Sequence, residues 1–434
     1  MISFKKCLCL TTAFIVVAPY AAAAGFQLKE QSASLQGLSF AGATAKANDA
    51  STIFFNPAGM TRLGKKEVLG NVSFIKPTSE FNVDSVTAAT GGGASFPISS
   101  DDNGGDPSKI NAVPSLYGLT TFDNGVKFGL SVNTPFGLST NYNEGWVGRY
   151  YALKSDLLTI NISPNFAYKF NDKLSLGVGA EFQYIEAELS SAINVDSFIG
   201  GGASDGFTRM KGDDIGFGFR LGALYEFDEN TRVGLSYKSR IRHELIGDIY
   251  FENVGALATN PNFQHSEIKA SIQTPDVLSL GLYHEVDDQW SVLADAAWTN
   301  WSVFKNLLIT NRDNGLVRQN VAEEWDDSYF ASLGFEYHPC HCDNKTFQFG
   351  VAYDKTPISD DYRTFRIPGE DRYWISTGYL YDWGKGNSLS LGYSHVFVDE
   401  AKTTEDDGAA NKGVISGSFD SSVDILSFNL SMKF

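Results

Sequence analysis

The sequence predicts an all-β protein, a 14-stranded antiparallel transmembrane β-barrel with an N-terminal hatch of short helices inside its lumen. Three observations lead to this fold. Apolar and small polar residues alternate along many segments, these segments are even in number, and their connections alternate between short turns and long loops. A closed antiparallel barrel in a bacterial membrane has an even strand number, with short turns at one end and longer loops at the other.

The alternation is clearest at the end of the chain. In residues 426–434, Leu, Phe, Leu, Met and Phe alternate with Ser, Asn, Ser and Lys, and residues 126–133 and 174–184 show the same pattern. A period of two gives a strand two unlike faces. Because the second face is mostly Gly, Ser and Asn rather than charged, we place it in a lumen and the apolar face in lipid. A soluble all-β protein is the alternative.

The barrel is expected to occupy residues 65–434. Short connections carry turn residues, as in Asp123-Asn124-Gly125, and are expected at the periplasmic end, whereas long loops such as 82–110 and 400–417 are expected outside. Closure leaves no unpaired strand edge in the hydrocarbon. The expected strands are 67–81, 111–122, 126–136, 156–170, 174–190, 213–227, 232–251, 268–286, 290–309, 325–338, 346–357, 372–382, 388–399 and 418–434.

Residues 1–24 are predicted to be a cleaved secretory signal, because two lysines precede an apolar run and alanines suited to a signal peptidase. The net charge of −17 argues against nucleic acid as a partner. Two of the four cysteines fall in this signal, and the others form Cys340-His341-Cys342. That spacing suits neither a disulfide framework nor a structural zinc site, so we expect a turn in the periplasm and no metal.

Residues 25–64 are predicted to form the hatch. A barrel of this width is not filled by its own side chains, and the segment is too short and weakly apolar to form a core alone. Small residues such as Ala41, Gly42 and Ala43 would let short helices pack closely against a glycine-rich wall. Pro57 is expected to end one helix where it meets that wall.

Several motifs together resemble one family. They are AGFQL at 24–28, NDAST at 48–52, FNPAGMT at 55–61, TNW at 299–301, the long stretch YDKTPISDDYRTFRIPGEDRYWISTGYLY at 353–381 and the terminal Phe434. Over nearly the whole chain the sequence resembles the long-chain fatty acid transporters of bacterial outer membranes (FadL-type). A terminal aromatic residue on an alternating strand also fits the signal that outer-membrane assembly machinery reads.

The resemblance implies passive uptake of long-chain fatty acids or similar hydrophobic compounds. Ligands would be captured between extracellular loops, held at an inner site near the mature N-terminus, and released laterally through a gap where the third strand kinks. In this chain the third strand runs into Thr134-Pro135-Phe136-Gly137, where proline removes a ladder donor and glycine tolerates a bend. The expected lateral gate comprises Asn56, Pro57, Ala58, Pro135, Phe136 and Gly137.

Candidate ligand-binding residues lie in the hatch and on one strand. Phe26, Leu28, Phe54 and Phe55 would line an apolar pocket, or would only pack the hatch against the wall. Arg220 shares its strand face with glycines and therefore points into the lumen. It would either pair with Glu181, Glu226 or a hatch acid, or anchor a ligand carboxylate.

The identity of the ligand stays open at this point. The family's carboxylate-binding basic residues would fall in 183–191 and 323–334, but these stretches carry acids and no Arg or Lys. A neutral aromatic or aliphatic hydrocarbon is therefore an alternative ligand. A general diffusion porin is the alternative from a different class, and it would lack the hatch.

An enzymatic function is not expected. Ser394 and His395 are adjacent on a strand, so their side chains point to opposite faces and cannot act together as nucleophile and base. The sequence has no Walker-type phosphate loop, and we expect no cofactor. The expected partners are a hydrophobic ligand, outer-membrane lipid, surface glycolipid near the acidic loops, and the assembly machinery. The protein is expected to be a monomer.

Two further clusters have predicted structural roles. Arg363, Arg366 and Arg372, with nearby acids, are expected to brace a long loop, as surface ion networks commonly do. The WTNW element, Trp298 to Trp301, is expected to join the aromatic girdle at a membrane interface.

Overall fold

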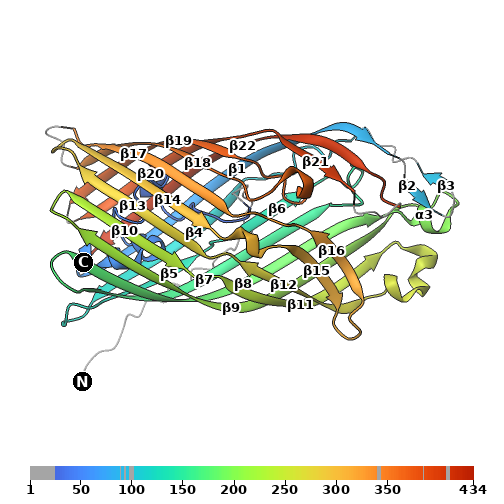
Figure 1. Ribbon diagram of the computed structural model, residues 1–434, viewed down its shortest axis with the longest axis horizontal. Helices are drawn as coiled ribbons and strands as arrows, with labels where there is room; N and C mark the ends of the chain where they lie inside the picture. The colour runs from blue at the N-terminus through green and yellow to red at the C-terminus, as the bar shows by residue number, and fades with distance from the viewer. Residues whose placement is uncertain are drawn as a thin grey trace, which may run out of the picture.

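The computed structural model describes residues 25–87, 89–91, 94–96, 102–339, 344–384, 386–406 and 411–434. The predicted signal, Cys340-His341-Cys342 and parts of the acidic loops lie outside these residues. Within them, the chain forms a closed antiparallel barrel of 14 strands, which confirms the predicted fold class. Figure 1 shows the barrel from the side, with the C-terminus at one end and β2, β3 and α3 at the other.

Eight of the barrel strands are single segments, and six are built from two collinear segments separated by a short break. The single strands are β1 (Lys66–Val86), β4 (Asn111–Thr121), β7 (Lys154–Lys169), β8 (Leu174–Ile193), β9 (Gly206–Glu226), β18 (Lys345–Asp354), β19 (Arg372–Gly384) and β22 (Ile415–Lys433). The divided strands are β5/β6 (Lys127–Asn133, Gly137–Asn141), β10/β11 (Thr231–Lys238, Ile241–Glu252), β12/β13 (Ser266–Thr274, Val277–Glu285), β14/β15 (Trp290–Thr299, Asn306–Asn311), β16/β17 (Val317–Ala322, Ser328–Tyr337) and β20/β21 (Asn387–Val398, Ala401–Glu405).

The first and last strands close the barrel. β1 pairs with β22 from Glu67 opposite Lys433 to Val86 opposite Ile415, and its other edge pairs with β4. A small hairpin of β2 (Ala89–Gly91) and β3 (Ala94–Phe96) extends the loop between β1 and β4. Because every barrel strand has a partner on each side over part of its length, the backbone hydrogen bonds that lipid cannot supply come from neighbouring strands.

The two faces of the strands are occupied as the alternation predicts. On β22, Leu426, Phe428, Leu430 and Met432 are 38–48% exposed, whereas Ser427, Asn429 and Ser431 are at most 2% exposed. The apolar face therefore points outward, and the small polar face lines the interior. These apolar residues do not meet one another in a dry core, as they would in the alternative of a soluble all-β protein.

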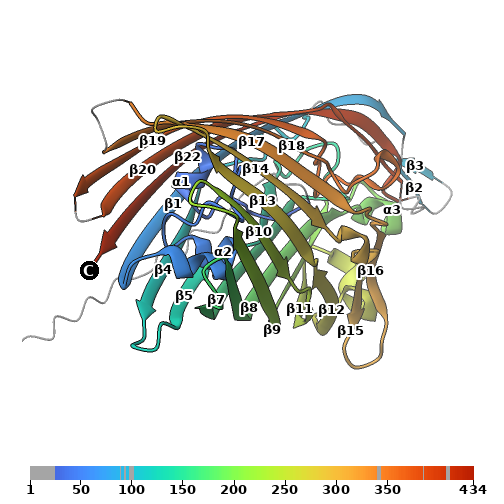
Figure 2. The same ribbon diagram turned by 60° about the vertical axis from the view of Figure 1, so that its left-hand side comes forward.

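Short helices of the N-terminal segment, residues 25–64, lie inside the barrel. They are α1 (Ala33–Gln36), α2 (Thr52–Phe55) and the 3-10 helix η1 (Pro57–Arg62), and Figure 2 shows α1 and α2 within the barrel near the end that carries the C-terminus. Asn56 caps η1 by accepting a hydrogen bond from the backbone of Ala58. Pro57 therefore begins a helix after α2 has ended, because its fixed φ suits the first helical position.

The remaining helices lie in loops. They are α3 (Val195–Ile199) and the 3-10 helices η2 (Gly255–Thr259), η3 (Pro261–Phe263), η4 (Trp301–Val303) and η5 (Asp360–Tyr362). None of the helices found in the described residues has the length and apolar character needed to cross a membrane.

Glycines on the inner face allow the N-terminal segment to approach the wall. A Cβ atom added to Gly350 would lie 2.1 Å from the carbonyl carbon of Leu38, and one added to Gly234 would lie 2.0 Å from the carbonyl oxygen of Thr44. Real Cβ atoms do not approach other atoms so closely, so a larger side chain would push the segment away. The glycine-rich inner face is thus the surface on which the segment rests.

The third strand is interrupted at the predicted place. β5 ends at Asn133 and β6 begins at Gly137, and the pairing of β4 with this strand extends only as far as Leu116 opposite Val132. β6 pairs with β7 on its other side. We call Thr134–Gly137 the bend. Pro135 supplies no backbone donor there, so the ladder ends and the chain turns out of register.

Candidate functional site

Three cavities of the interior define the candidate site: an outer cavity, an apolar cavity and an inner cavity. The outer cavity has about 1550 Å³ of open space at the end with the long loops, and Tyr150, Phe251, Phe263 and Arg318 are among its lining residues. It shares Met210, Leu307, Glu323 and Arg366 with the apolar cavity. The two cavities are therefore adjacent, with these shared side chains between them.

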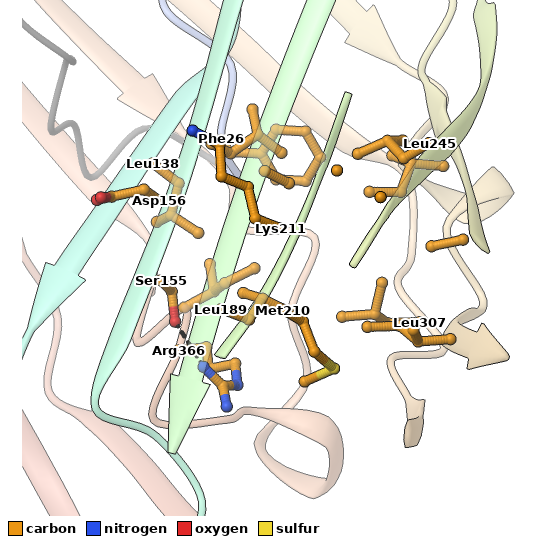
Figure 3. Close-up of a pocket in the computed structure, with 18 of the residues that line it drawn as sticks. Phe26, Leu138, Ser155, Asp156, Leu189, Met210, Lys211, Leu245, Leu307 and Arg366 are labelled. Atoms are coloured by element: carbon orange, nitrogen blue, oxygen red, sulfur yellow. Dashed lines mark hydrogen bonds between the residues drawn. The ribbon is translucent and has the colours of Figure 1, made fainter. Parts of the chain in front are cut away.

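The apolar cavity has about 790 Å³ of open space, including solvent, and a mostly aliphatic wall. Figure 3 shows Leu189, Met210, Leu245 and Leu307 around it, with Arg366 hydrogen-bonded to Ser155 at one end. Its apolar lining comprises Phe26, Leu138, Leu157, Ala187, Leu189, Met210, Leu245, Ile268, Ala270, Ile272, Phe304, Leu307, Ile309 and Ile367. A cavity with this lining suits a hydrophobic molecule.

Two buried ionisable groups from loops stand at the junction of the outer and apolar cavities. Arg366 donates hydrogen bonds to Ser155 Oγ at 2.9 Å and to the carbonyl oxygen of Tyr151 at 2.7 Å, and burial lowers its pKa to about 10. Glu323 accepts a hydrogen bond from Trp325 Nε1 at 2.9 Å, and burial raises its pKa to about 8. Burial disfavours the charged form of each group.

Phe26 closes the apolar cavity on the side of the bend. Its ring lies 4.6 Å from that of Trp301, 5.8 Å from Trp325 and 5.9 Å from Phe136, measured between centroids. We call these rings, together with Phe304, the aromatic cluster. Trp301 is completely buried in it, so the prediction that Trp301 belongs to a membrane girdle is wrong. The chain turns inward through η4 after β14 ends, and this carries the indole into the lumen.

The backbone beside Phe26 is paired with the bend. Gln27 bridges Phe136, Leu28 N donates to Pro135 O at 2.8 Å, and Gly137 N donates to Phe26 O at 2.9 Å. A side cavity of about 530 Å³ adjoins this point, lined by Gly25, Pro77–Ser79, Pro107 and Leu138–Thr140 among others. The N-terminal residues thus pair with the third strand at a level where β4 no longer does.

The predicted hatch triplet lies elsewhere. Asn56 Nδ2 donates to Ala223 O on β9 at 2.9 Å, and added Cβ atoms at Gly177 and Gly222 would meet Pro57 and Ala58. The triplet therefore rests on β8 and β9, whereas residues 26–28 occupy the position beside the bend that the sequence analysis gave to Asn56, Pro57 and Ala58. The glycines of β8 and β9 leave room for the backbone of η1, which explains this placement.

The inner cavity, of about 630 Å³, gathers four of the five predicted ligand residues. Leu28, Phe54, Phe55 and Arg220 line it, together with Phe40, Val277 and Phe330, while Phe26 lines the apolar cavity instead. Arg220 Nε lies 2.9 Å from Glu181 Oε1, and both side chains are buried. Arg220 therefore has the acidic partner that the sequence analysis named first.

Sequence reasoning missed several residues of this site. Lys29 and Lys238 also line the inner cavity, and Trp325 completes the aromatic cluster. Lys238 lies on the same strand face as Gly234 and Ser236, which alternate along β10, so this pattern was a usable signal for a lumenal lysine. Trp325 carried no comparable signal, because it precedes the strand β17 and its position depends on a loop.

The other predicted clusters have structural contacts. Arg363 pairs with Asp360 at 2.5 Å and with Glu370, which fits a braced loop. Ser394 faces the lumen and contacts Gln36, whereas His395 pairs with Asp424 at 2.8 Å on the other face. Over the described part of the chain, no group of three or more His, Cys, Asp or Glu side chains is placed to hold a metal ion.

Comparisons with known proteins agree with this architecture. The family described as "Outer membrane protein transport protein (OMPP1/FadL/TodX)" matches residues 14–434. The long-chain fatty acid transport protein of Escherichia coli O6:H1 is 28% identical over 427 residues, which cover 92% of this chain and 93% of the relative.

Solved structures share the fold. A Pseudomonas aeruginosa FadL homologue superimposes with a TM-score of 0.85 at 24% identity, covering 95% of this chain and all of the homologue. The toluene transporter TodX of P. putida superimposes with a TM-score of 0.67 at 15% identity, covering 95% of this chain and 99% of TodX. On the strength of the family match over almost its whole length, this chain belongs to the FadL/TodX family of bacterial outer-membrane transport proteins, which are β-barrel channels rather than enzymes.

Proposed function

We propose that this protein takes up long-chain fatty acids or similar hydrophobic compounds passively and releases them sideways into the membrane. One observation carries the proposal: an aliphatic cavity, adjacent to the outer cavity at the long-loop end, is lined at its other end by Phe26, whose backbone is paired with the interrupted third strand. We also infer that residues 1–24 are the signal, 25–64 the hatch and 65–434 the barrel.

The driving force for such uptake is apolar burial. Each CH₂ group that leaves water gains about 0.8 kcal/mol, so a long acyl chain would enter the apolar cavity without an energy source. From there the ligand would pass the aromatic cluster to the inner cavity and the side cavity. Release beside the bend would require residues 26–28 to leave their backbone partners, because these residues cover the opening.

Two alternatives make different demands on the structure. A neutral hydrocarbon channel fits the same apolar cavity, and the P. putida relative of this fold is called a toluene transporter. A general diffusion porin would need an open polar lumen, whereas α1, α2 and η1 are packed against the inner wall here. The free acid and the neutral ligand are therefore the alternatives to separate by experiment.

Filling the apolar cavity tests the proposed route. Ala270→Trp places an indole among the lining residues of β12, and Ser271→Trp places the same ring on the exposed face of the same strand. Uptake of labelled palmitate by cells should fall to the level of cells without the protein for Ala270→Trp and stay unchanged for Ser271→Trp. Normal uptake by a folded, surface-exposed Ala270→Trp protein would refute the route through this cavity.

A further inference from the structure

Within the proposed function, we propose that Gln31 of the N-terminal segment is a positioning residue that bridges β4 and the third strand where these two strands part. The bridge confines the lateral opening to the level of residues 26–28. This role rests on the proposed function, because an opening beside the bend matters only if ligand leaves there. Gln31 is completely buried, and its carboxamide is bonded to both strands.

β4 and the third strand separate after Val132. Their last pair joins Leu116 to Val132, although β4 continues to Asn111 and stays paired with β1 on its other side. The same register would set Pro114 opposite Thr134. Proline has no N–H to donate, so β4 offers no backbone donor at that position. The buried polar groups of Thr134 therefore need a partner from another part of the chain.

The carboxamide of Gln31 supplies that partner. Its Nε2 donates to Thr134 O at 2.8 Å, and its Oε1 accepts from Thr134 N at 3.4 Å. A carboxamide has one donor side and one acceptor side, as a peptide group does, so this side chain reproduces the pair of bonds that a neighbouring strand makes. The third strand thus keeps a strand-like partner for one residue after β4 has left it.

The same glutamine is also bonded to β4. Ser115 Oγ donates to Gln31 Oε1 at 2.7 Å, and the hydroxyl of Tyr117 donates to the backbone carbonyl oxygen of Gln31 at 2.8 Å. Asn133 Nδ2, on the third strand, donates to Gln31 Oε1 at 3.3 Å and to the Tyr117 hydroxyl oxygen at 2.8 Å. Gln31 therefore ties the two strands together in a buried network of hydrogen bonds.

Bonds at the point of separation oppose its spread along the wall. If β4 and β5 parted further, their backbone groups would lose partners that hydrocarbon cannot replace. Residues 26–28 are bonded to the bend beyond Thr134, at Pro135 and Gly137. They can leave those partners while Gln31 keeps its own. The wall then opens on one side of Thr134 and stays closed on the other.

Cysteine labelling tests the bridge. The parent chain carries Thr134→Cys, which keeps the backbone groups that bond to Gln31, together with Cys340→Ser and Cys342→Ser. Purified full-length protein in lipid vesicles is treated with a lipid-soluble maleimide and, separately, with a charged maleimide in the water. Gln31→Met should raise the labelling rate of the lipid-soluble reagent roughly five- to thirtyfold, the effect of losing one or two hydrogen bonds. The labelling rate of the charged reagent should stay unchanged.

Gln36 provides a matched control. It is a buried glutamine of the same segment, but its Nε2 bonds to Ser394 on β20, a strand that pairs with β19 and β22 and with neither β4 nor the third strand. Gln36→Met should leave both labelling rates unchanged. Ser115→Ala removes only the bond from the β4 side chain, and should raise the rate of the lipid-soluble reagent about fivefold.

The outcomes separate the bridge from the proposed function. The heat-dependent shift of folded barrels on gels shows which variants fold, and Ser115→Ala keeps the test open if Gln31→Met does not fold. Equal lipid-soluble rates in the parent chain and in every folded variant would refute the bridge. A rise for the charged reagent alone would refute it too, because Gln31 would then seal the lumen and not the wall. Neither result touches palmitate uptake by the native protein, whose absence would refute the proposed function instead.

Discussion

The two parts of the N-terminal segment are held in different ways. Residues 31–63 are fixed to the wall by buried polar groups: Lys46 pairs with Glu336 at 2.8 Å, and Ala33 N donates to Asn71 and Asn429. Residues 25–28 are held by two backbone hydrogen bonds to the bend and by ring contacts. An ion pair with directional hydrogen bonds allows one arrangement, whereas ring contacts and two backbone bonds tolerate more displacement. We therefore expect residues 31–63 to act as a fixed stopper and residues 25–28 as a releasable flap.

Energetics support this division. Breaking a buried ion pair leaves an uncompensated charge and costs about 3–5 kcal/mol, while a typical backbone hydrogen bond contributes about 1 kcal/mol net. Local opening proceeds through the parts of a structure with the fewest such constraints. We therefore expect residues 25–28 to open before residues 31–63.

Locking the flap should have the largest effect. Gln27 and Phe136 form a non-hydrogen-bonded antiparallel pair, flanked by the two backbone hydrogen bonds. The Cα atoms of such a pair lie about 4.5 Å apart, a separation that a disulfide can bridge. In a chain with Cys340→Ser and Cys342→Ser, the double variant Gln27→Cys, Phe136→Cys should lose palmitate uptake completely when oxidised. Reduction should restore uptake in the same cells.

The same protein is its own control, because oxidised and reduced forms differ only in the cross-link. Single-cysteine variants should respond to neither oxidant nor reductant. If the cross-linked protein takes up palmitate as fast as the same protein after chemical reduction, residues 25–28 do not act as a flap.

Breaking the buried ion pair of residues 31–63 should lower the unfolding free energy of the protein rather than its uptake rate. Lys46→Met leaves Glu336 buried with only Gln348 as a hydrogen-bond donor, and should lower the unfolding free energy by about 3–5 kcal/mol. The double variant Lys46→Met, Glu336→Met should recover most of this loss, because two apolar side chains replace the pair. The unfolding free energies of the native protein and both variants are measured in lipid vesicles. Single-channel recordings of the same three proteins should show ion leakage only for Lys46→Met. If Lys46→Met is as stable as the native protein and leaks no more ions, residues 31–63 are not held in place by this ion pair.

The sequence predicted the barrel because its signal is local and repeated. Alternation along 426–434 assigns each side chain to lipid or lumen without knowledge of any distant residue. The interruption at Pro135 was also predictable, since proline and glycine act on their own backbone. Contacts that join distant segments were not: nothing near Asn56 indicates that it bonds to Ala223, and nothing near Phe26 indicates its pairing with the bend.

The sequence likewise predicted which face of a strand a side chain lies on better than where a side chain in a connecting segment lies. Arg220 was assigned to the lumen because it shares a strand face with glycines, and Glu181 was one of the partners considered for it; the structure pairs the two. Trp301 was assigned to the membrane interface, because an aromatic residue at a strand end usually lies there. Its inward turn depends on η4 and on the space beside Phe26, which only the folded chain defines.

The smallest predicted effect concerns pH and the rings that hold the flap. Trp325 contacts Phe26 and donates to Glu323, whose pKa burial raises from 4.5 to about 8. Between these values the folded protein keeps Glu323 protonated and the unfolded chain does not. Stability should therefore fall as pH rises from about 5 to 8, by up to roughly 1.4 kcal/mol per pH unit.

Glu323→Gln should flatten this slope, whereas Glu324→Gln, which changes the exposed neighbour, should not. Unfolding free energies of the native protein and both variants, measured from pH 5 to 9, test the assignment. Parallel curves for the native protein and Glu323→Gln would show that Glu323 is ionised in the folded protein across this range. Glu323 would then carry a constant negative charge beside Trp325, and pH would have no effect on the ring contacts that hold residues 25–28.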